Sequence, residues 1–85
     1  MAICKMSFET TSAIGAKKAQ EIVQKASEYE ADMILRYENK EVDLKSILGI
    51  MSLAVLEGAK IDIEAKGPDA NEAIAALEAF FNANL

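Results

Sequence analysis

The stretch that decides the fold is residues 33–44, which read MILRYENKEVDL. On both sides of its midpoint, apolar and polar residues alternate with the period of two that is typical of a strand with one buried face. A central two-residue turn places Leu35 opposite Val42 and Met33 opposite Leu44, so both apolar sets lie on one face of the hairpin. The stretch therefore predicts an antiparallel hairpin with a single core-facing side.

The rest of the chain predicts five more elements from the same kind of pattern. Two of the predicted helices are preceded by a residue that commonly acts as an N-cap. Ser46 precedes the short helix. Asp69 precedes the last helix, and Glu72 follows it three residues later, as in a capping box. The elements are a strand at 4–9, a helix at about 16–27, a short helix from residue 47 that Gly58 ends, a strand at 61–65, and a helix with the apolar stripe 73–81. The order strand, helix, strand, strand, helix, strand, helix predicts an α+β fold, with helices packed on the one apolar face of a four-stranded sheet.

Size and composition restrict the classes of function. The 85 residues suffice for one domain, 1–85, with one core, and 52% of them are hydrophobic. No apolar run approaches the ~20 residues needed to span a bilayer, and we expect a cytoplasmic protein that does not bind a membrane. A net charge of -5 argues against direct nucleic-acid binding.

The residue types that usually carry catalysis or metal binding are scarce. The chain has no histidine, the commonest acid, base and phosphoryl acceptor near neutral pH. Its single cysteine, Cys4, cannot form an internal disulfide and leaves a structural zinc site without a ligand set. Cys4, Met6 and Phe8 occupy every second position of the predicted strand and share its buried face, which favours a core thiol over a reactive one. We expect neither an enzyme nor a bound cofactor or metal.

The segment 43–53, DLKSILGIMSL, together with this order of elements, resembles HPr, the phosphocarrier protein of the bacterial sugar phosphotransferase system, and its HPr-like relatives. The resemblance covers essentially the whole chain, since the segments 26–29, 31–32, 57–59 and 67–78 and Tyr37 also fall where the family has like residues. It implies an open-faced sandwich, a four-stranded antiparallel sheet covered on one face by three helices.

The chain departs from the family at one site. In a phosphocarrier HPr, the loop that enters the first helix carries a histidine followed by alanine, arginine and proline, where this chain reads Gly15, Ala16, Lys17 and Lys18. Glycine offers no side-chain atom to phosphorylate, and lysine keeps the charge of arginine but lacks its bidentate fork. The resemblance therefore implies a family member that lacks the acceptor histidine. Lys17 and Lys18 are either solvated charges or, beside the bare amides at Gly15, a residual site for a partner's carboxylate or phosphate.

Ser46 has two interpretations. One is a plain N-cap of the helix that follows it. The other comes from the resemblance, because in many HPr proteins of Gram-positive bacteria the matching serine is phosphorylated by an ATP-dependent kinase. Ile47, Leu48 and Met51 are then either part of the core-facing stripe, which suits Ile50 and Leu53 better, or an exposed apolar patch that the family uses to meet its kinase and a transcriptional regulator.

The resemblance and the missing histidine together favour one function. They indicate an HPr-like regulatory or binding module of carbon catabolite control, phosphorylated at Ser46, with protein partners that include an HPr serine kinase, a transcriptional regulator or phosphotransferase-system components. An alternative is a phosphocarrier or accessory component of sugar phosphotransfer that uses another site. A second alternative is an acyl-carrier-like protein with a prosthetic group on Ser46, which the predicted strands disfavour because those carriers are helical bundles.

Overall fold

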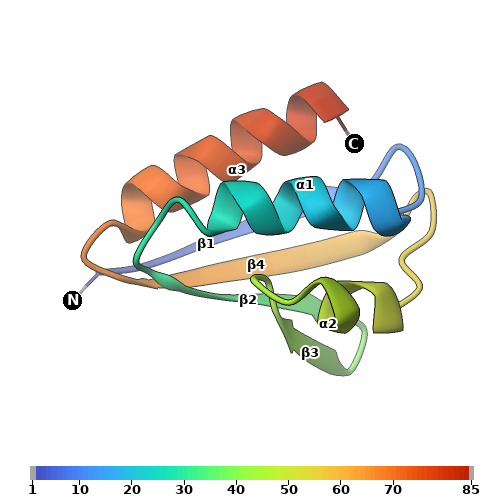
Figure 1. The fold of residues 1–85 in the computed structure, drawn as a ribbon, viewed down its shortest axis with the longest axis horizontal. Coiled ribbons are helices and arrows are strands. Elements are labelled where there is room, and N and C mark those ends of the chain that lie inside the picture. Colours follow the sequence, from blue (N-terminus) through green and yellow to red (C-terminus); the bar gives the residue numbers. More distant parts are fainter. Residues whose placement is uncertain (1, 85) are drawn as a thin grey trace.

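The computed structural model describes residues 2–84 and contains the predicted order of elements (Figure 1). Each element follows the hydrophobic period of its segment, and most bounds agree with the predicted ones within a few residues. The elements are β1 (Ala2–Glu9), α1 (Ala16–Ala26), β2 (Asp32–Tyr37), β3 (Lys40–Asp43), α2 (Ile47–Ser52), β4 (Lys60–Gly67) and α3 (Ala70–Asn84).

The four strands form one antiparallel sheet in the order β1-β4-β2-β3. The predicted register of the β2–β3 hairpin is confirmed: Leu35 pairs with Val42, and the Leu44 amide donates to the Met33 carbonyl at 3.0 Å. β1 and β3 are the edge strands. The edge position of β1 explains why Cys4 and Phe8 are only half-buried, although they lie on the same side of the strand as the buried Met6.

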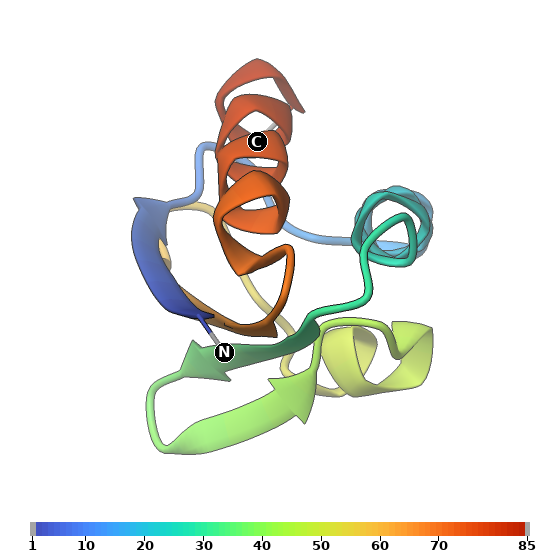
Figure 2. The ribbon, with the colours of Figure 1, turned by 90° about the vertical axis from the view of Figure 1, so that its left-hand side faces the viewer.

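The three helices lie on one side of the sheet and leave the other side uncovered (Figures 1 and 2). A single apolar core fills the space between the sheet and the helices, with Phe81, Ile22 and Leu35 each fully buried. The four-stranded sheet with three helices on one face, predicted from the hydrophobic periods, is thus confirmed. Within residues 2–84, no helix is long and apolar enough to cross a membrane.

The second helix is shorter than predicted. It ends at Ser52, with Leu53 as its C-cap, and does not continue to Gly58. Ala54 has a φ of 51°, in the left-handed region, where an α-helix cannot continue. The remaining segment, 53–59, is irregular, and several of its backbone groups bind the loop between β1 and α1.

Asp69 has a longer-range role than its local pattern indicates. It precedes α3, and its carbonyl accepts from the Ala73 amide at 2.9 Å, as expected of the residue before a helix. Its two carboxylate oxygens, however, accept from the amides of Glu30 and Ala31, each at 2.8 Å. The side chain therefore fixes the α1–β2 loop against the start of α3.

Candidate functional site

The entrance to α1 carries no side chain that could accept a phosphoryl group at position 15. Gly15 is the N-cap residue, with extended backbone angles (φ -92°, ψ -171°) and no side-chain hydrogen bond to cap the helix. A Cβ built at Gly15 would meet nothing within 4 Å. The fold would therefore accommodate a larger side chain at position 15, and steric crowding does not require glycine there.

Two lysines occupy the first turn of α1. Lys17 is exposed, and Lys18 is half-buried, with its Nζ donating to the Ser12 hydroxyl at 2.9 Å. No acidic residue lies in the first turn of this helix. Since cations at a helix N-terminus oppose the helix dipole, this arrangement lowers the stability of the helix slightly while creating a locally positive surface.

Ser46 caps α2 as predicted. Its Oγ accepts a hydrogen bond from the Gly49 amide at 3.0 Å. A Cβ at position 49 would lie 3.2 Å from that Oγ and 3.3 Å from the Cβ of Val42. Glycine, a poor helix former, is accommodated in this short helix because it leaves room for the Ser46 hydroxyl and for the edge strand.

The exposed side of α2 is apolar. Leu48 is 81% exposed, Met51 43% and Ile47 37%, whereas Ile50 and Leu53 are buried. Of the two interpretations left open by the sequence for Ile47, Leu48 and Met51, the structure shows the exposed patch. Leu56, in the irregular segment after α2, is 65% exposed and was missed, because the sequence pattern placed it inside a helix.

Thr10 joins the two halves of this region. It is 2% exposed, its amide donates to the Ala59 carbonyl at 2.9 Å, and its carbonyl accepts from the Gly58 amide at 2.8 Å. Its Oγ1 donates to the Leu56 carbonyl at 2.7 Å and accepts from the Ala59 amide at 3.0 Å. The loop that leads into α1 and the segment that follows α2 are thereby held as one unit, so that the surfaces at residues 15–18 and 46–56 keep a fixed relation.

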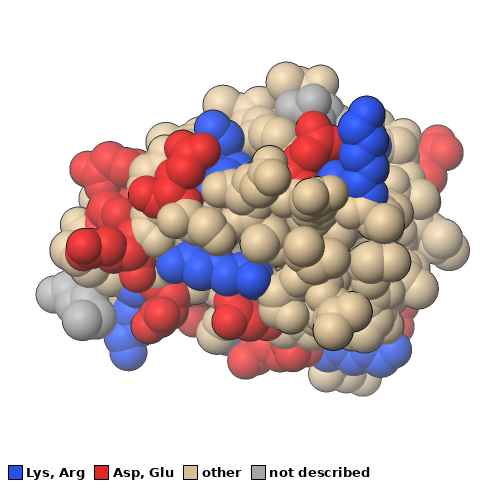
Figure 3. Space-filling view, in the orientation of Figure 1, with Lys and Arg blue, Asp and Glu red and all other residues tan. Residues whose placement is uncertain are grey.

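The charges of the visible face are unevenly distributed (Figure 3). In the space-filling view, acidic side chains gather toward the left-hand end, where α1 ends and α3 begins, and the surface over α2 is largely uncharged (Figure 3). An apolar patch of this kind, with lysines nearby, suits contact with a protein better than contact with nucleic acid.

The uncovered face of the sheet carries charges that serve the fold. Arg36 contacts Glu41 at 2.9 Å and Glu64 at 3.5 Å, and Lys5 contacts Glu64 at 3.4 Å. The hydrogen bond from Arg36 is the main reason that the pKa of Glu64 lies below its usual value. These pairs are solvated and contribute little each, but they alternate in sign across neighbouring strands.

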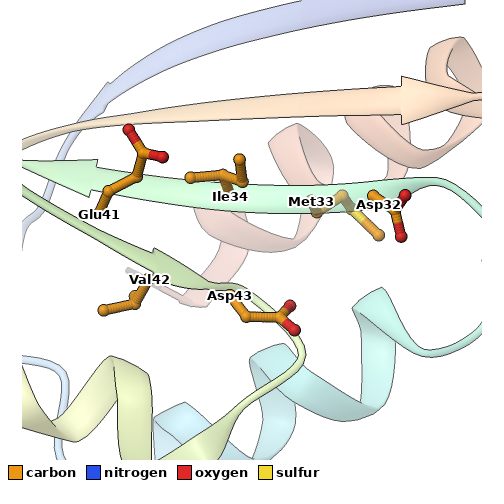
Figure 4. Close-up of a pocket in the computed structure, with 6 residues that line it drawn as sticks. All are labelled: Asp32, Met33, Ile34, Glu41, Val42 and Asp43. Atoms are coloured by element: carbon orange, nitrogen blue, oxygen red, sulfur yellow. The ribbon is translucent and has the colours of Figure 1, made fainter.

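A hollow of about 310 Å³ lies beside β2 and β3, lined by Asp32, Met33, Ile34, Glu41, Val42 and Asp43 (Figure 4). Glu41 is paired with Arg36, and the Asp43 carboxylate accepts from the Lys45 amide at 2.9 Å. No group of three or more histidine, cysteine, aspartate or glutamate side chains within residues 2–84 could hold a metal ion. The hollow shares no residue with the Ser46 surface, and two of its carboxylates, those of Glu41 and Asp43, already form contacts within the fold.

Comparison with known proteins agrees with the fold. Residues 5–83 match the family model described as the PTS HPr component phosphorylation site. The chain belongs to the HPr family. A phosphocarrier protein HPr from Bacillus anthracis str. Ames is 36% identical, over 95% of this chain and 99% of that one, with a TM-score of 0.87.

Two further solved structures of the HPr family are similar to this chain. HPr-C-His from Thermoanaerobacter tengcongensis is 34% identical, over 98% of this chain and 93% of that one, with a TM-score of 0.85. The Bacillus subtilis catabolite repression protein Crh is 33% identical, over 100% of this chain and 98% of that one, with a TM-score of 0.78. The chain is thus similar both to phosphocarriers of the family and to a relative named for catabolite repression.

Proposed function

We propose that this HPr-family chain is a non-enzymatic regulatory module of carbon catabolite control in the cytoplasm. Its Ser46 is phosphorylated by an ATP-dependent HPr kinase, and the chain does not act as a histidine phosphocarrier. The observation that carries the proposal is the pairing of a glycine at position 15 with an intact Ser46 surface. The acceptor atom is missing where a phosphocarrier needs it, while the serine retains its cap geometry and its exposed apolar neighbours.

The geometry at Ser46 suits a phosphorylation that leaves the fold intact. Ser46 is half-buried, and the Gly49 amide donates to its Oγ at 3.0 Å. A phosphate carries roughly -1.5 to -2 charge, and its oxygens accept amide hydrogen bonds as well as a hydroxyl does. The modification therefore changes the surface beside Ile47, Leu48 and Met51, the proposed contact patch for the kinase and a transcriptional regulator, without breaking the cap.

Gly15, Ala16, Lys17 and Lys18 have an accessory role in this proposal. With no side chain at position 15, the first turn of α1 offers amides and lysine charge to an anionic group of a partner. The Thr10 hydrogen bonds keep this turn in register with the α2 patch. One protein partner can therefore contact both the first turn of α1 and the apolar patch on α2.

Incubation with an HPr serine kinase and ATP, followed by phosphopeptide mapping, tests the proposal. We expect one phosphate on Ser46, lost in Ser46→Ala. Ser52→Ala is the matched control, because Ser52 lies on the same helix and is exposed, but its hydroxyl donates to the Gly49 carbonyl at 2.7 Å. A phosphate that persists in Ser46→Ala and disappears in Ser52→Ala would refute the assignment.

A further inference from the structure

The exposed apolar patch on α2 contains one residue, Met51, that small oxidants can modify without an enzyme. Of the three methionines within residues 2–84, Met6 is 7% exposed, Met33 2% and Met51 43%. Oxidation requires an oxidant to reach the thioether sulfur, and a buried methionine is reached only when the core opens locally. Met51 is therefore the methionine of this part of the chain that a dissolved oxidant reaches in the folded protein.

Met51 belongs to the outer surface of α2 and not to the core. It follows Ile47 by four positions and Leu48 by three, which is the spacing of neighbours on a helix surface. Long side chains of a helix lean toward its N-terminal end and cover the turn before their own Cα. The position of Met51 therefore places its thioether over the turn that Ser46 caps, beside the two other exposed apolar residues of this helix.

We propose that Met51 is an oxidation site and that its sulfoxide weakens the contact of the α2 patch with a protein partner. The oxidant is a peroxide. A lone pair of the sulfur attacks one oxygen of hydrogen peroxide, an S–O bond forms, the O–O bond breaks, and the other oxygen leaves as water after taking up the proton of the first. The sulfur is oxidised and the peroxide is reduced. Methionine sulfoxide reductases return the side chain to the thioether, so the modification is reversible.

Oxidation of Met51 changes the chemistry of the patch but not the contacts that hold α2. A sulfoxide is polar, so a partner that covers it has to desolvate a polar group within an apolar contact. The residue that α2 buries is Ile50, and the helix cap is formed by the Ser46 hydroxyl and the Gly49 amide. We therefore expect the oxidised protein to stay folded. The weakened contact rests on the proposed function, because it requires a partner on this patch, whereas the site of oxidation does not.

Peptide mapping by mass spectrometry, after exposure of the folded protein to hydrogen peroxide, tests the site. We expect the peptide with Met51 to gain one oxygen at least about tenfold faster than those with Met6 and Met33, because buried sulfurs react only from locally opened states. The protein unfolded in urea is the control, and there the three methionines should react at similar rates. Similar rates in the folded protein, or loss of the fold on oxidation as seen by circular dichroism, would overturn the proposal.

The rate at which an HPr serine kinase and ATP phosphorylate Ser46 tests the consequence. Once the peroxide is removed, kcat/KM should be about tenfold lower for the oxidised protein, as expected when a contact at the centre of an interface is lost. Treatment with methionine sulfoxide reductases should restore it. Met51→Leu, which keeps an apolar side chain of similar volume, is the matched variant, and peroxide should leave its rate unchanged. This variant retains Cys4, so equal inhibition of variant and wild type would show that Met51 is not the residue responsible.

The inference and the proposed function fail in different ways. Equal phosphorylation rates for the untreated and oxidised proteins would contradict the role of Met51 and leave the assignment of Ser46 intact. An untreated protein that the kinase does not modify at Ser46 would contradict the proposed function and, with it, the weakened contact. Peptide mapping decides the site of oxidation in either case.

Discussion

At the scale of single residues, two glycines, Gly49 and Gly15, leave space at the positions discussed above. Gly49 has no Cβ, and one placed there would lie 3.2 Å from the Ser46 Oγ. Gly15 has no side chain either, but the space around it is open. Packing therefore favours glycine at position 49, whereas at position 15 the space would admit a larger side chain.

Ala54 is a residue whose backbone conformation costs stability. Its φ of 51° lies in the left-handed region that glycine adopts without steric cost, and its side chain is exposed. We expect Ala54→Gly to raise the free energy of unfolding by about 0.5 kcal/mol, as the relieved strain exceeds the entropy that glycine loses on folding. Urea denaturation measures this change in the free energy of unfolding. Ala79→Gly, an exposed position inside α3, should lower stability by about 1 kcal/mol, and equal losses in both variants would contradict the account.

Gly67 ends β4 where two backbones approach closely. A Cβ there would lie 2.7 Å from the Cα of Ala31, a backbone atom that cannot move aside cheaply. Gly67→Ala should therefore lower the free energy of unfolding by about 3 kcal/mol. Gly15→Ala is the matched control and should cost less than about 1 kcal/mol. Thermal and urea unfolding of both variants measure the difference, and a well-tolerated Gly67→Ala would show that the Ala31 contact is not close in solution.

At the scale of elements, long-range polar contacts fix what hydrophobic burial leaves undetermined. Asp69 joins the start of α3 to the α1–β2 loop, and Lys45 joins the segment before α2 to the same loop, donating to the Tyr29 carbonyl at 2.8 Å. Thr10 joins the entrance of α1 to the segment after α2. The helices are thus held at their ends as well as along their apolar faces.

The Asp69 contact makes stability depend on pH. The pKa of Asp69 lies below its usual 3.8, chiefly because the Glu30 amide bonds the ionised carboxylate. A lowered folded-state pKa means stabilisation that is complete above the unfolded value and lost as pH falls through the folded one. We expect the free energy of unfolding contributed by this contact to be constant from neutral pH to about 5 and to decline below about 4.

Asp69→Asn should lower stability at neutral pH and reduce this acid-dependent decline. Glu72→Gln, which removes an exposed carboxylate from the first turn of α3, is the control and should retain the decline. Urea titrations at a series of pH values measure both. A wild type and an Asp69→Asn variant that lose stability in parallel below pH 4 would show that Asp69 is not responsible.

At the scale of the whole molecule, the sequence predicted the parts that follow from local period and failed where the chain binds distant segments. Hydrophobic alternation predicted the strands and the hairpin register, and Ser46 marked the start of α2. The sequence predicts helix up to Gly58, and residues 53–57 are irregular instead. Their apolar side chains follow α2 directly, and nothing local shows that Thr10 binds the backbone of this segment. The exposure of Leu56 was missed for the same reason. The roles of Asp69 and Lys45 were missed because their partners are backbone groups, which have no sequence signature.

The central claim is that phosphate enters this protein through Ser46 and not through position 15. Intact mass spectrometry tests it most directly, with the same preparation incubated in parallel with phosphoenolpyruvate and the first enzyme of the phosphotransferase system, and with ATP and HPr serine kinase. The account predicts a single acid-stable phosphate from ATP, absent in Ser46→Ala, and no addition from phosphoenolpyruvate, because Gly15 offers no acceptor atom. An acid-labile phosphoryl adduct formed from phosphoenolpyruvate, with none from ATP, would contradict it.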